Sequence, residues 1–151
     1  MPLTLHTLAK GKQANIYALG DGGSVQVIDF LEEMEQKRPK EVAKMAALLD
    51  RVIEHGIPKD KQKCRTLGNK LYEFKTRGGL RIVWFWDEEK MVICTHGFKK
   101  STQKTPRGQI ERALSKKADN AIKITARLKV NKCGVIKVLS KRKYNFIKLP
   151  F

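Results

Sequence analysis

Basic side chains recur along the stretch from Leu71 to Pro106, where their types and spacing suit chemistry on a phosphodiester. Lys75, Arg81 and Lys100 lie in this stretch, together with His96. Arginine and lysine stabilise the charge that develops on a reacting phosphate, and histidine has a pKa near neutrality. A lysine crowded by other cations has a lowered pKa and can also transfer a proton. These four residues are our candidate catalytic groups for metal-independent RNA cleavage, in which the ribose 2′-hydroxyl attacks the adjacent phosphate.

Further basic residues in and beside this stretch could hold an RNA backbone. Arg77 precedes a Gly-Gly turn, Lys99 lies in a Lys-Lys pair, and Lys104 and Arg107 belong to the basic loop and the segment after it. Because such side chains bind phosphates without reading sequence, we expect these four to bind nucleic acid. The alternative is that they are ordinary solvated charges. The convergence of strand alternation, turn placement and the lysine run on one surface favours RNA binding.

The identity of the proton-transfer group is left open by the sequence. His96 is either a general acid or base, or a structural histidine at a corner of the chain. Cys94 lies two positions before it, so both would share one face of a strand, although a buried structural cysteine is the better interpretation of Cys94. Cys64 and Cys133 are far apart, and the spacing predicts neither a zinc site nor disulfides. We therefore expect no metal and no small-molecule cofactor.

A β-meander is needed to position these residues, and alternating patterns predict one. Paired glycines between the first two strands accept the positive φ of a tight turn. The predicted strands are Leu71–Thr76, Leu80–Trp86 and Met91–Thr95. Because side chains two residues apart share a face, one face would pack on helices and the other would stay open: Phe74, Ile82 and Trp84 on the first, Lys75, Arg77 and Arg81 on the second.

Two helices are predicted before the meander. A strand at Asn15–Leu19 leads into a helix that Ser24 caps and that ends near Gln36. Pro39 suits the first turn of a second helix, which ends at Gly56. Both helices carry apolar residues at helical spacing, so we assign them to the core and give them no chemistry.

The predicted domain covers residues 15–120 and lies between two extensions. Residues 1–14 are weakly patterned, which is typical of a frayed N-terminal extension. A third helix, capped by Thr105, begins at Pro106 and ends near Ala118. Residues 121–151 contain nine basic residues and no acidic one, and form either a hairpin or a partly disordered arm. The expected fold class is α+β, with two N-terminal helices packed on an antiparallel meander and a short C-terminal helix.

The net charge of +17 is the dominant property of the whole chain. Residues 65–120 carry a net +7 and residues 121–151 a net +9, whereas residues 25–64 are balanced. This distribution predicts attraction to nucleic acid or to an acidic protein partner. The sequence has neither an apolar run long enough to span a bilayer nor the apolar core of a signal peptide, so we expect a cytoplasmic protein with no membrane partner.

The segment LYEFKTRGGLRIVWFW, followed by HGFKKSTQKTP, resembles the phage-derived, RelE-like toxins of the HigB type, from type II toxin–antitoxin systems. The similarity extends from about Asn15 to Asn120. It implies a small RelE/ParE-like α+β domain that inhibits translation by cleaving mRNA on the ribosome. It also implies contacts with ribosomal RNA and a helix-turn-helix antitoxin protein that holds the toxin inactive.

The resemblance also implies roles for single residues. Four of them stand where RelE-like toxins have basic residues on a strand or after the third strand: Lys75, Arg77, Lys99 and Lys100. Arg81 matches the arginine after the glycine turn, which contacts the scissile phosphate in that family. His96 belongs to the HGF motif of this group. Glu73 stands where RelE has a lysine, although HigB-type toxins often show LYE at this place.

Two other functions explain the same residues. A non-catalytic RNA- or ribosome-binding module accounts equally well for the positive charge, and growth arrest without transcript cleavage would identify it. A gyrase-poisoning toxin on the same fold, as in the ParE branch, would cause a DNA damage response without mRNA cleavage.

Overall fold

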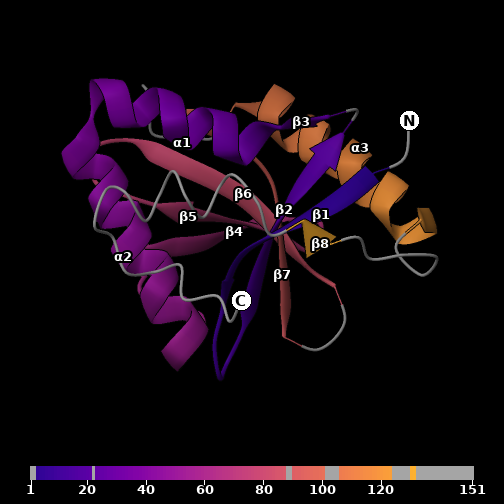
Figure 1. The fold of residues 1–151 in the computed structure, drawn as a ribbon, viewed down its shortest axis with the longest axis horizontal. Coiled ribbons are helices and arrows are strands. Elements are labelled where there is room, and N and C mark those ends of the chain that lie inside the picture. The colour runs from indigo at the N-terminus through magenta and orange to yellow at the C-terminus, as the bar shows by residue number, and fades with distance from the viewer. Residues whose placement is uncertain (1–2, 22, 88–89, 101–105, 124–129, 132–151) are drawn as a thin grey trace.

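A mixed β-sheet forms the centre of the protein, with helices packed against it (Figure 1). The computed structural model describes residues 3–21, 23–87, 90–100, 106–123 and 130–131. Within these residues the sheet has eight strands in the order β4-β5-β6-β7-β2-β1-β8, and β3 pairs with β2. The strands are β1 (Leu3–Lys10), β2 (Asn15–Asp21), β3 (Ser24–Val25), β4 (Cys64–Gly68), β5 (Leu71–Lys75), β6 (Leu80–Asp87), β7 (Met91–Lys99) and β8 (Val130–Asn131). The helices are α1 (Gln26–Lys37), α2 (Pro39–His55) and α3 (Arg107–Lys123).

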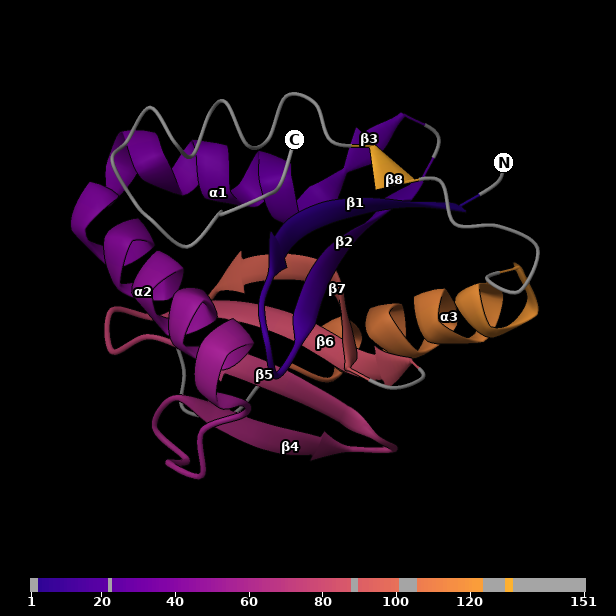
Figure 2. The ribbon, with the colours of Figure 1, turned by 60° about the horizontal axis from the view of Figure 1, so that its bottom comes forward.

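The α+β class is confirmed, but the sheet is mixed rather than antiparallel throughout. Strands β4 to β7 form an antiparallel meander, whereas β2 pairs in parallel with β7, and β8 in parallel with β1. The larger core cluster joins one side of the sheet to α1 and α2 (Figure 2). Phe74, Ile82 and Trp84 belong to it, as strand alternation predicted, and the rings of Phe74 and Trp84 stack with centroids 4.9 Å apart.

Both N-terminal helices are confirmed, with one difference at the start of α1. Ser24 does not cap this helix, because it lies in β3 and its hydroxyl donates a hydrogen bond to Asp29. Pro39 opens α2, and Gly56 ends it at a φ of 88°, a conformation that glycine adopts without strain. The apolar stripes of both helices are buried in the core, as expected.

The N-terminal residues form a strand inside the sheet, so the expectation that residues 1–14 would fray is wrong for Leu3–Lys10. Strand β1 pairs antiparallel with β2 along nearly its whole length. A register shift between Thr7 and Ala9 places the consecutive residues Leu8 and Ala9 in the same core cluster, whereas Leu5 lies in the cluster on the other side of the sheet. This bulge breaks the simple alternation by which a strand is recognised in a sequence.

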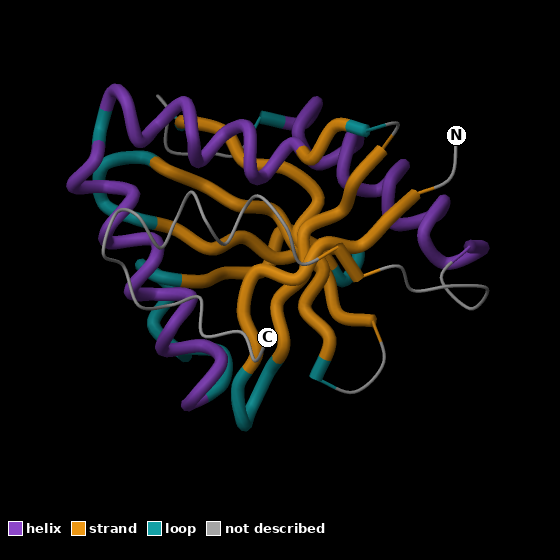
Figure 3. The backbone as a smooth tube through the Cα atoms, viewed as in Figure 1, coloured by secondary structure: helices purple, strands orange, loops and turns teal. Residues whose placement is uncertain are grey.

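The three predicted meander strands are present, and a short loop joins the first two (Figure 3). A fourth strand, β4, precedes them and pairs with β5, although its residues were expected to be a polar connector. Strand β4 is short, and its side chains alternate between buried or half-buried and exposed positions at the edge of the sheet. A short edge strand with few buried apolar side chains shows only weak alternation in the sequence, so it is hard to predict.

Strand β7 continues to Lys99, beyond the predicted end at Thr95. Its pairing with β6 shifts register at Thr95, because Trp84 opposes Cys94 while Val83 opposes His96. Such a bulge turns the following side chains to the other face of the sheet. Cys94 therefore lies in the core beneath α1 and α2, whereas His96 lies on the side that α3 covers. The expectation that Cys94 and His96 share a face is wrong.

Helix α3 packs against the second face of the sheet. Ala113 is fully buried there, and Ile110 and Leu114 pack around it against Phe85 and Ile93, so the predicted inward positions are confirmed. The cap expected from Thr105 lies outside the described residues, as does most of the segment expected to be a hairpin or a disordered arm. None of the described helices is long and apolar enough to cross a membrane.

Candidate active site

A buried carboxylate, that of Glu73 in β5, gathers cations from the neighbouring strands. Glu73 is 0% exposed, and in the sheet it stands opposite Arg65 of β4 and Val83 of β6. Its Oε2 accepts a hydrogen bond from Nε of Arg65 at 2.5 Å, and its Oε1 lies 4.0 Å from Nε of Arg81. Because a buried charge is costly unless it is paired, Glu73 holds these two guanidinium groups near each other.

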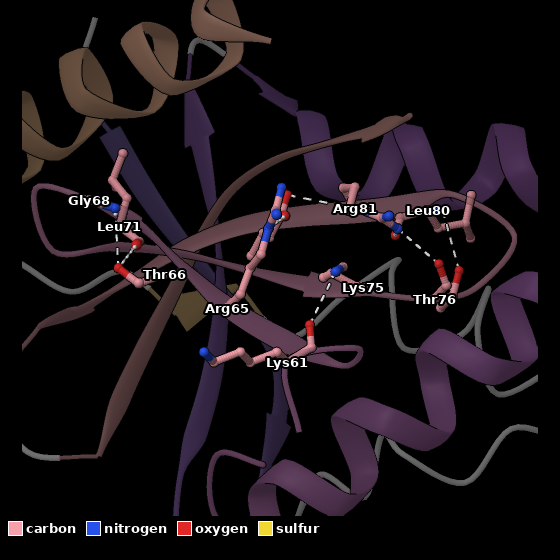
Figure 4. Close-up of polar contacts among 10 residues, drawn as sticks. Lys61, Arg65, Thr66, Gly68, Leu71, Lys75, Thr76, Leu80 and Arg81 are labelled. Atoms are coloured by element: carbon pink, nitrogen blue, oxygen red, sulfur yellow. Dashed lines mark hydrogen bonds and ion pairs between the residues drawn. The ribbon is translucent and has the colours of Figure 1, made fainter. Parts of the chain in front are cut away.

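Arg81 is anchored by the backbone as well as by Glu73. Its Nη1 donates hydrogen bonds to the carbonyl oxygens of Thr76, at 2.8 Å, and Leu80, at 2.9 Å (Figure 4). The side chain is only 11% exposed. Burial lowers the pKa of Arg81, Glu73 raises it and Arg65 lowers it, yet an arginine keeps its proton at neutral pH. The result is a fixed positive charge at the start of β6.

The Gly-Gly turn before Arg81 is tied to helix α2. The amide of Gly78 donates a hydrogen bond to Oε1 of Glu41 at 2.7 Å, and Nζ of Lys44 lies 3.0 Å from Oε2 of the same carboxylate. Burial raises the pKa of Glu41, but hydrogen bonds from Lys44 and from the turn lower it overall. Arg77 occupies the exposed corner of this anchored turn.

Two lysines stand beside the guanidinium groups. Lys75 is the cross-strand partner of Arg81, and its Nζ donates a hydrogen bond to the carbonyl oxygen of Lys61 at 3.1 Å. Lys100 is 8% exposed, and its amide bonds to the turn that precedes β6. Burial lowers the pKa of both ammonium groups, and the neighbouring arginines lower it further, while Glu73 raises it. Both lysines thus have the lowered pKa that the sequence predicted for a lysine among cations.

His96 lies on the same face of the sheet as Glu73, with Val83 between them, but it is buried beneath α3. Only 1% of its surface is exposed, and its Nδ1 lies 3.0 Å from the hydroxyl of Thr95. Burial lowers its pKa to about 4, Arg112 lowers it as well, and the side chain of Gln109 acts in the opposite direction. The imidazole is therefore neutral at pH 7, in surroundings typical of a structural histidine.

The residues expected to bind nucleic acid are spread more widely. Arg77 lies at the exposed turn beside the cluster, and Lys99 is exposed at the end of β7. Arg107 is exposed at the start of α3, where its Nε is 3.1 Å from Oε1 of Glu111. Lys104 lies outside the described residues. Of the three members of this set that the structure describes, Arg77 is the one that lies next to Lys75 and Arg81.

Neither described cysteine has the surroundings of a nucleophile. Cys64 and Cys94 are free and buried. Burial raises the pKa of the Cys64 thiol to about 12, and it raises the pKa of Cys94 as well. Both therefore stay protonated near neutral pH, which agrees with their interpretation as structural residues.

Sequence reasoning missed the part that Arg65 and Glu73 play in this cluster. Arg65 was assigned to a connector, and Glu73 was noted only as a departure from the RelE pattern. A sequence signal existed, because an acidic residue in an alternating strand among basic residues needs a cationic partner if it is buried. What the sequence did not show was β4, the strand that brings Arg65 opposite Glu73.

The cluster does not have the donor set of a cation site. Four cationic side chains surround one carboxylate, so the local field repels a divalent ion. Among the described residues, no group of three or more histidine, cysteine or carboxylate side chains is placed to hold a metal. The groups that do converge are suited to an anion, and arginines and lysines commonly bind phosphate.

Comparison with known proteins supports a phage origin. The model of the family described as "Phage derived protein Gp49-like (DUF891)" matches residues 29–118, which is more than half of the chain. The matched segment includes every residue of the Glu73 cluster. A search of curated proteins finds no match.

Proposed function

The chain belongs to the phage-derived Gp49-like family, a family of type II toxins related to RelE and HigB, and we propose that it cleaves mRNA on the ribosome. The observation that carries the proposal is the cationic cluster around Glu73, which offers Arg65, Arg81, Lys75 and Lys100 to one phosphate. Because the side chain of Arg81 is fixed by two carbonyl groups, its charge needs no rearrangement when a phosphorane forms.

The reaction is an internal transfer within the RNA. The 2′-oxygen forms a bond to phosphorus while the bond from phosphorus to the 5′-oxygen breaks, which leaves a 2′,3′-cyclic phosphate and a 5′-hydroxyl. Lys100, with its lowered pKa, accepts the proton of the 2′-hydroxyl, and Lys75 donates a proton to the leaving 5′-oxygen. Arg81 and Arg65 stabilise the negative charge on the non-bridging oxygens.

His96 has no part in proton transfer in this scheme. Its imidazole is 1% exposed and, with a pKa of about 4, is neutral at pH 7, so it neither meets the RNA nor acts as a cationic general acid. Its role is to fill the space between β7 and α3. Of the two candidates that the sequence left open, His96 and a lysine, we therefore propose a lysine as the proton-transfer group.

The remaining basic residues hold the substrate and its surroundings. Arg77 binds the phosphate next to the cleaved bond, since its turn is anchored beside Arg81. Lys99, Lys104 and Arg107 contact the backbone of mRNA or ribosomal RNA, in the cytoplasm, where the ribosome lies. A helix-turn-helix antitoxin holds the protein inactive until it is released.

The test is to induce the wild type, Arg81→Ala and Lys12→Ala in a bacterial host and to map mRNA 5′ ends. Lys12 is an exposed lysine in the turn between β1 and β2, so its loss controls for the change in net charge. We expect Arg81→Ala to reduce cleavage by a factor of about 100 or more, while Lys12→Ala cleaves like the wild type. Equal cleavage by Arg81→Ala and the wild type would refute the catalytic assignment.

The same experiment separates the two alternative functions. Growth arrest by the wild type without new 5′ ends would indicate a non-catalytic ribosome-binding module. A DNA damage response without mRNA cleavage would indicate a gyrase poison. Either result would overturn the nuclease proposal, although the cationic cluster would still bind a phosphate backbone.

A further inference from the structure

A groove with a cavity of about 470 Å³ lies between α2 and the ends of β4 and β5. One wall comes from α2, through Lys44, Ala47, Leu48 and Arg51. Its volume falls within the range of about 300–1,000 Å³ that holds small ligands. Neither the expected catalytic chemistry nor the family resemblance assigned any role to these α2 residues.

The rim of the groove is strongly basic. Lys44 and Arg51 are seven positions apart, so they lie on the same side of α2, and Lys63 faces them from the segment before β4. Lys75 and Arg77 complete the rim. By sequence, residues 25–64 carry no net charge. The fold collects basic residues of this balanced segment into one place and joins them to those of the meander.

Asp60 is the acidic residue that lines the groove, and the backbone already uses its oxygens. Its Oδ1 accepts a hydrogen bond from the amide of Gln62 at 2.9 Å, and its carbonyl oxygen accepts bonds from the amides of Lys63 and Cys64, both at 3.0 Å. Asp60 thus shapes the chain at the mouth of the groove, and its single negative charge leaves the rim with an excess of basic residues. An anionic ligand fits this surface.

The groove is continuous with the Glu73 cluster through Lys75. Lys75 lines the groove and is also the cross-strand partner of Arg81. Its backbone amide bonds to the carbonyl oxygen of Lys63 at 2.8 Å, which fixes the basic rim relative to the cluster. An RNA backbone that extends from a phosphate bound at Arg81 would therefore contact Lys75 first and then Lys63 and Arg77.

The floor of the groove is apolar. Leu48 is 7% exposed and Ala47 is exposed beside it, one turn from both basic residues of α2. An apolar floor with a cationic rim matches a nucleotide, whose base avoids water while its phosphate seeks positive charge. A smooth cationic surface, by contrast, would favour phosphates alone.

We propose that this groove binds one nucleotide of single-stranded RNA, adjacent to the phosphate held by Arg81, with the base on Ala47 and Leu48. Lys63, Arg77 and Arg51 then hold the flanking phosphates. The identity of the ligand as RNA rests on the proposed function, but the binding site itself does not require cleavage. The groove extends the substrate path from the meander onto helix α2.

The test measures the affinity of the full chain for a fluorescent decauridylate by anisotropy, at several KCl concentrations. The variants are Arg51→Ala and Lys63→Ala, with Lys40→Ala as the control, an exposed lysine of α2 that does not line the groove. We expect each groove variant to weaken binding about threefold to tenfold near 0.1 M salt. The slope of log K against log salt should also fall by about 0.7, the value for one phosphate contact on a single strand. If Lys40→Ala weakens RNA binding as much as the groove variants do, the assignment of the groove as an RNA-binding site is overturned.

A second pair of variants tests the apolar floor. Ala47→Glu places a negative charge within the groove, and Gln36→Glu makes the same change of charge on the exposed face of α1. We expect Ala47→Glu to weaken RNA binding at least tenfold more than Gln36→Glu does. If decaglutamate displaces the RNA as well as unlabelled decauridylate does, the groove is a general polyanion site and the nucleotide assignment fails.

Cleavage assays distinguish this inference from the proposed function. Arg51→Ala should raise the KM for RNA, whereas Lys40→Ala, outside the groove, should cleave RNA with the KM of the wild type. If the protein never cleaves RNA but its affinity for RNA depends on Arg51 and Lys63, the groove assignment stands and the nuclease proposal fails. If the wild type and Arg51→Ala cleave RNA with the same KM, the nuclease proposal stands and the groove assignment fails.

Discussion

At the scale of single residues, the site depends on how Glu73 balances its neighbours. A fully buried carboxylate would be unfavourable alone, and two guanidinium groups this close would repel each other without it. Glu73 is thus a positioning residue that acts through Arg65 and Arg81, while its charge keeps Lys75 and Lys100 from losing their protons too readily. Burial lowers the pKa of both lysines, the neighbouring cations lower it further, and Glu73 opposes these effects.

Replacing Glu73 by Gln is predicted to reduce both stability and catalysis. The amide keeps the shape but leaves the cations of the cluster unbalanced, so we expect a loss of about 2–4 kcal/mol in the free energy of unfolding. The cleavage optimum should also move to lower pH, because both lysines lose the charge of Glu73, which raises their pKa. Urea denaturation and a pH–rate profile measure the two effects. Glu32→Gln, on the exposed face of α1, is the control, and an equal response of both variants would contradict the role of Glu73.

His96 makes the protein less stable in acid. In the folded protein its pKa is about 4, whereas an unfolded histidine has a pKa near 6.5, so below that pH the unfolded chain binds the extra proton. Stability that is complete above pH 6.5 is therefore lost as the pH falls to 4, by up to about 3 kcal/mol. Urea denaturation of His96→Gln between these pH values should show a flatter dependence. A slope unchanged in His96→Gln would contradict the prediction.

At the scale of elements, two devices place the cluster: the bulge of β7 and the turn before β6. The bulge at Thr95 aligns Lys100 with the turn, since the chain after it continues along β6 as far as Leu80. The turn itself needs glycine at Gly79, where φ is 97° and a Cβ atom would lie 2.7 Å from the carbonyl oxygen of Lys100. These constraints fix the distance between the ends of β5, β6 and β7.

Gly78 gives a direct test of how the turn is anchored. A Cβ atom there would meet the carboxylate of Glu41 at 2.2 Å, so Gly78→Ala should displace that side chain and break its hydrogen bond to the turn. We expect a cost of about 1–3 kcal/mol, measured by urea denaturation. In Glu41→Ala the same substitution should cost little, because the clash is gone. Gly108→Ala, at an open position of α3, should instead raise the free energy of unfolding by about 0.5–1 kcal/mol. A lower stability of Gly108→Ala would contradict the view that the clash with Glu41 causes the loss in Gly78→Ala.

At the scale of the whole molecule, the sequence predicted the elements whose pattern is regular. Both N-terminal helices and the meander followed from apolar spacing, and the placement of Lys75 and Arg81 followed from alternation. Alternation failed where a bulge interrupts it, as in β1 and at Thr95. It also failed for β4, which is defined by pairing with a distant partner rather than by its own residues. Long-range pairing of this kind is not encoded in local periodicity.

The candidate active site, like the fold, could be predicted only where its residues lie on regular strands. Side chains on one regular hairpin could be grouped by counting residues, whereas the burial of His96 depended on the bulge and on α3. The basic groove could not be found from the sequence, because it combines α2, the segment before β4 and the end of β5. Charges that cancel along residues 25–64 are separated in space once the chain folds.

The segment 132–151 should add electrostatic affinity without changing the chemistry. It carries six basic residues and no acidic one: Lys132, Lys137, Lys141, Arg142, Lys143 and Lys148. Replacing all six by Gln keeps the length and is predicted to weaken RNA binding and to lower the salt slope, by up to about 4 if every residue contacts a phosphate. The cleavage rate at saturating RNA should stay the same, because the Glu73 cluster is unaltered. Replacing the six by Arg is the control, with wild-type slope expected. An unchanged slope in the Gln variant would show that this charge serves another partner.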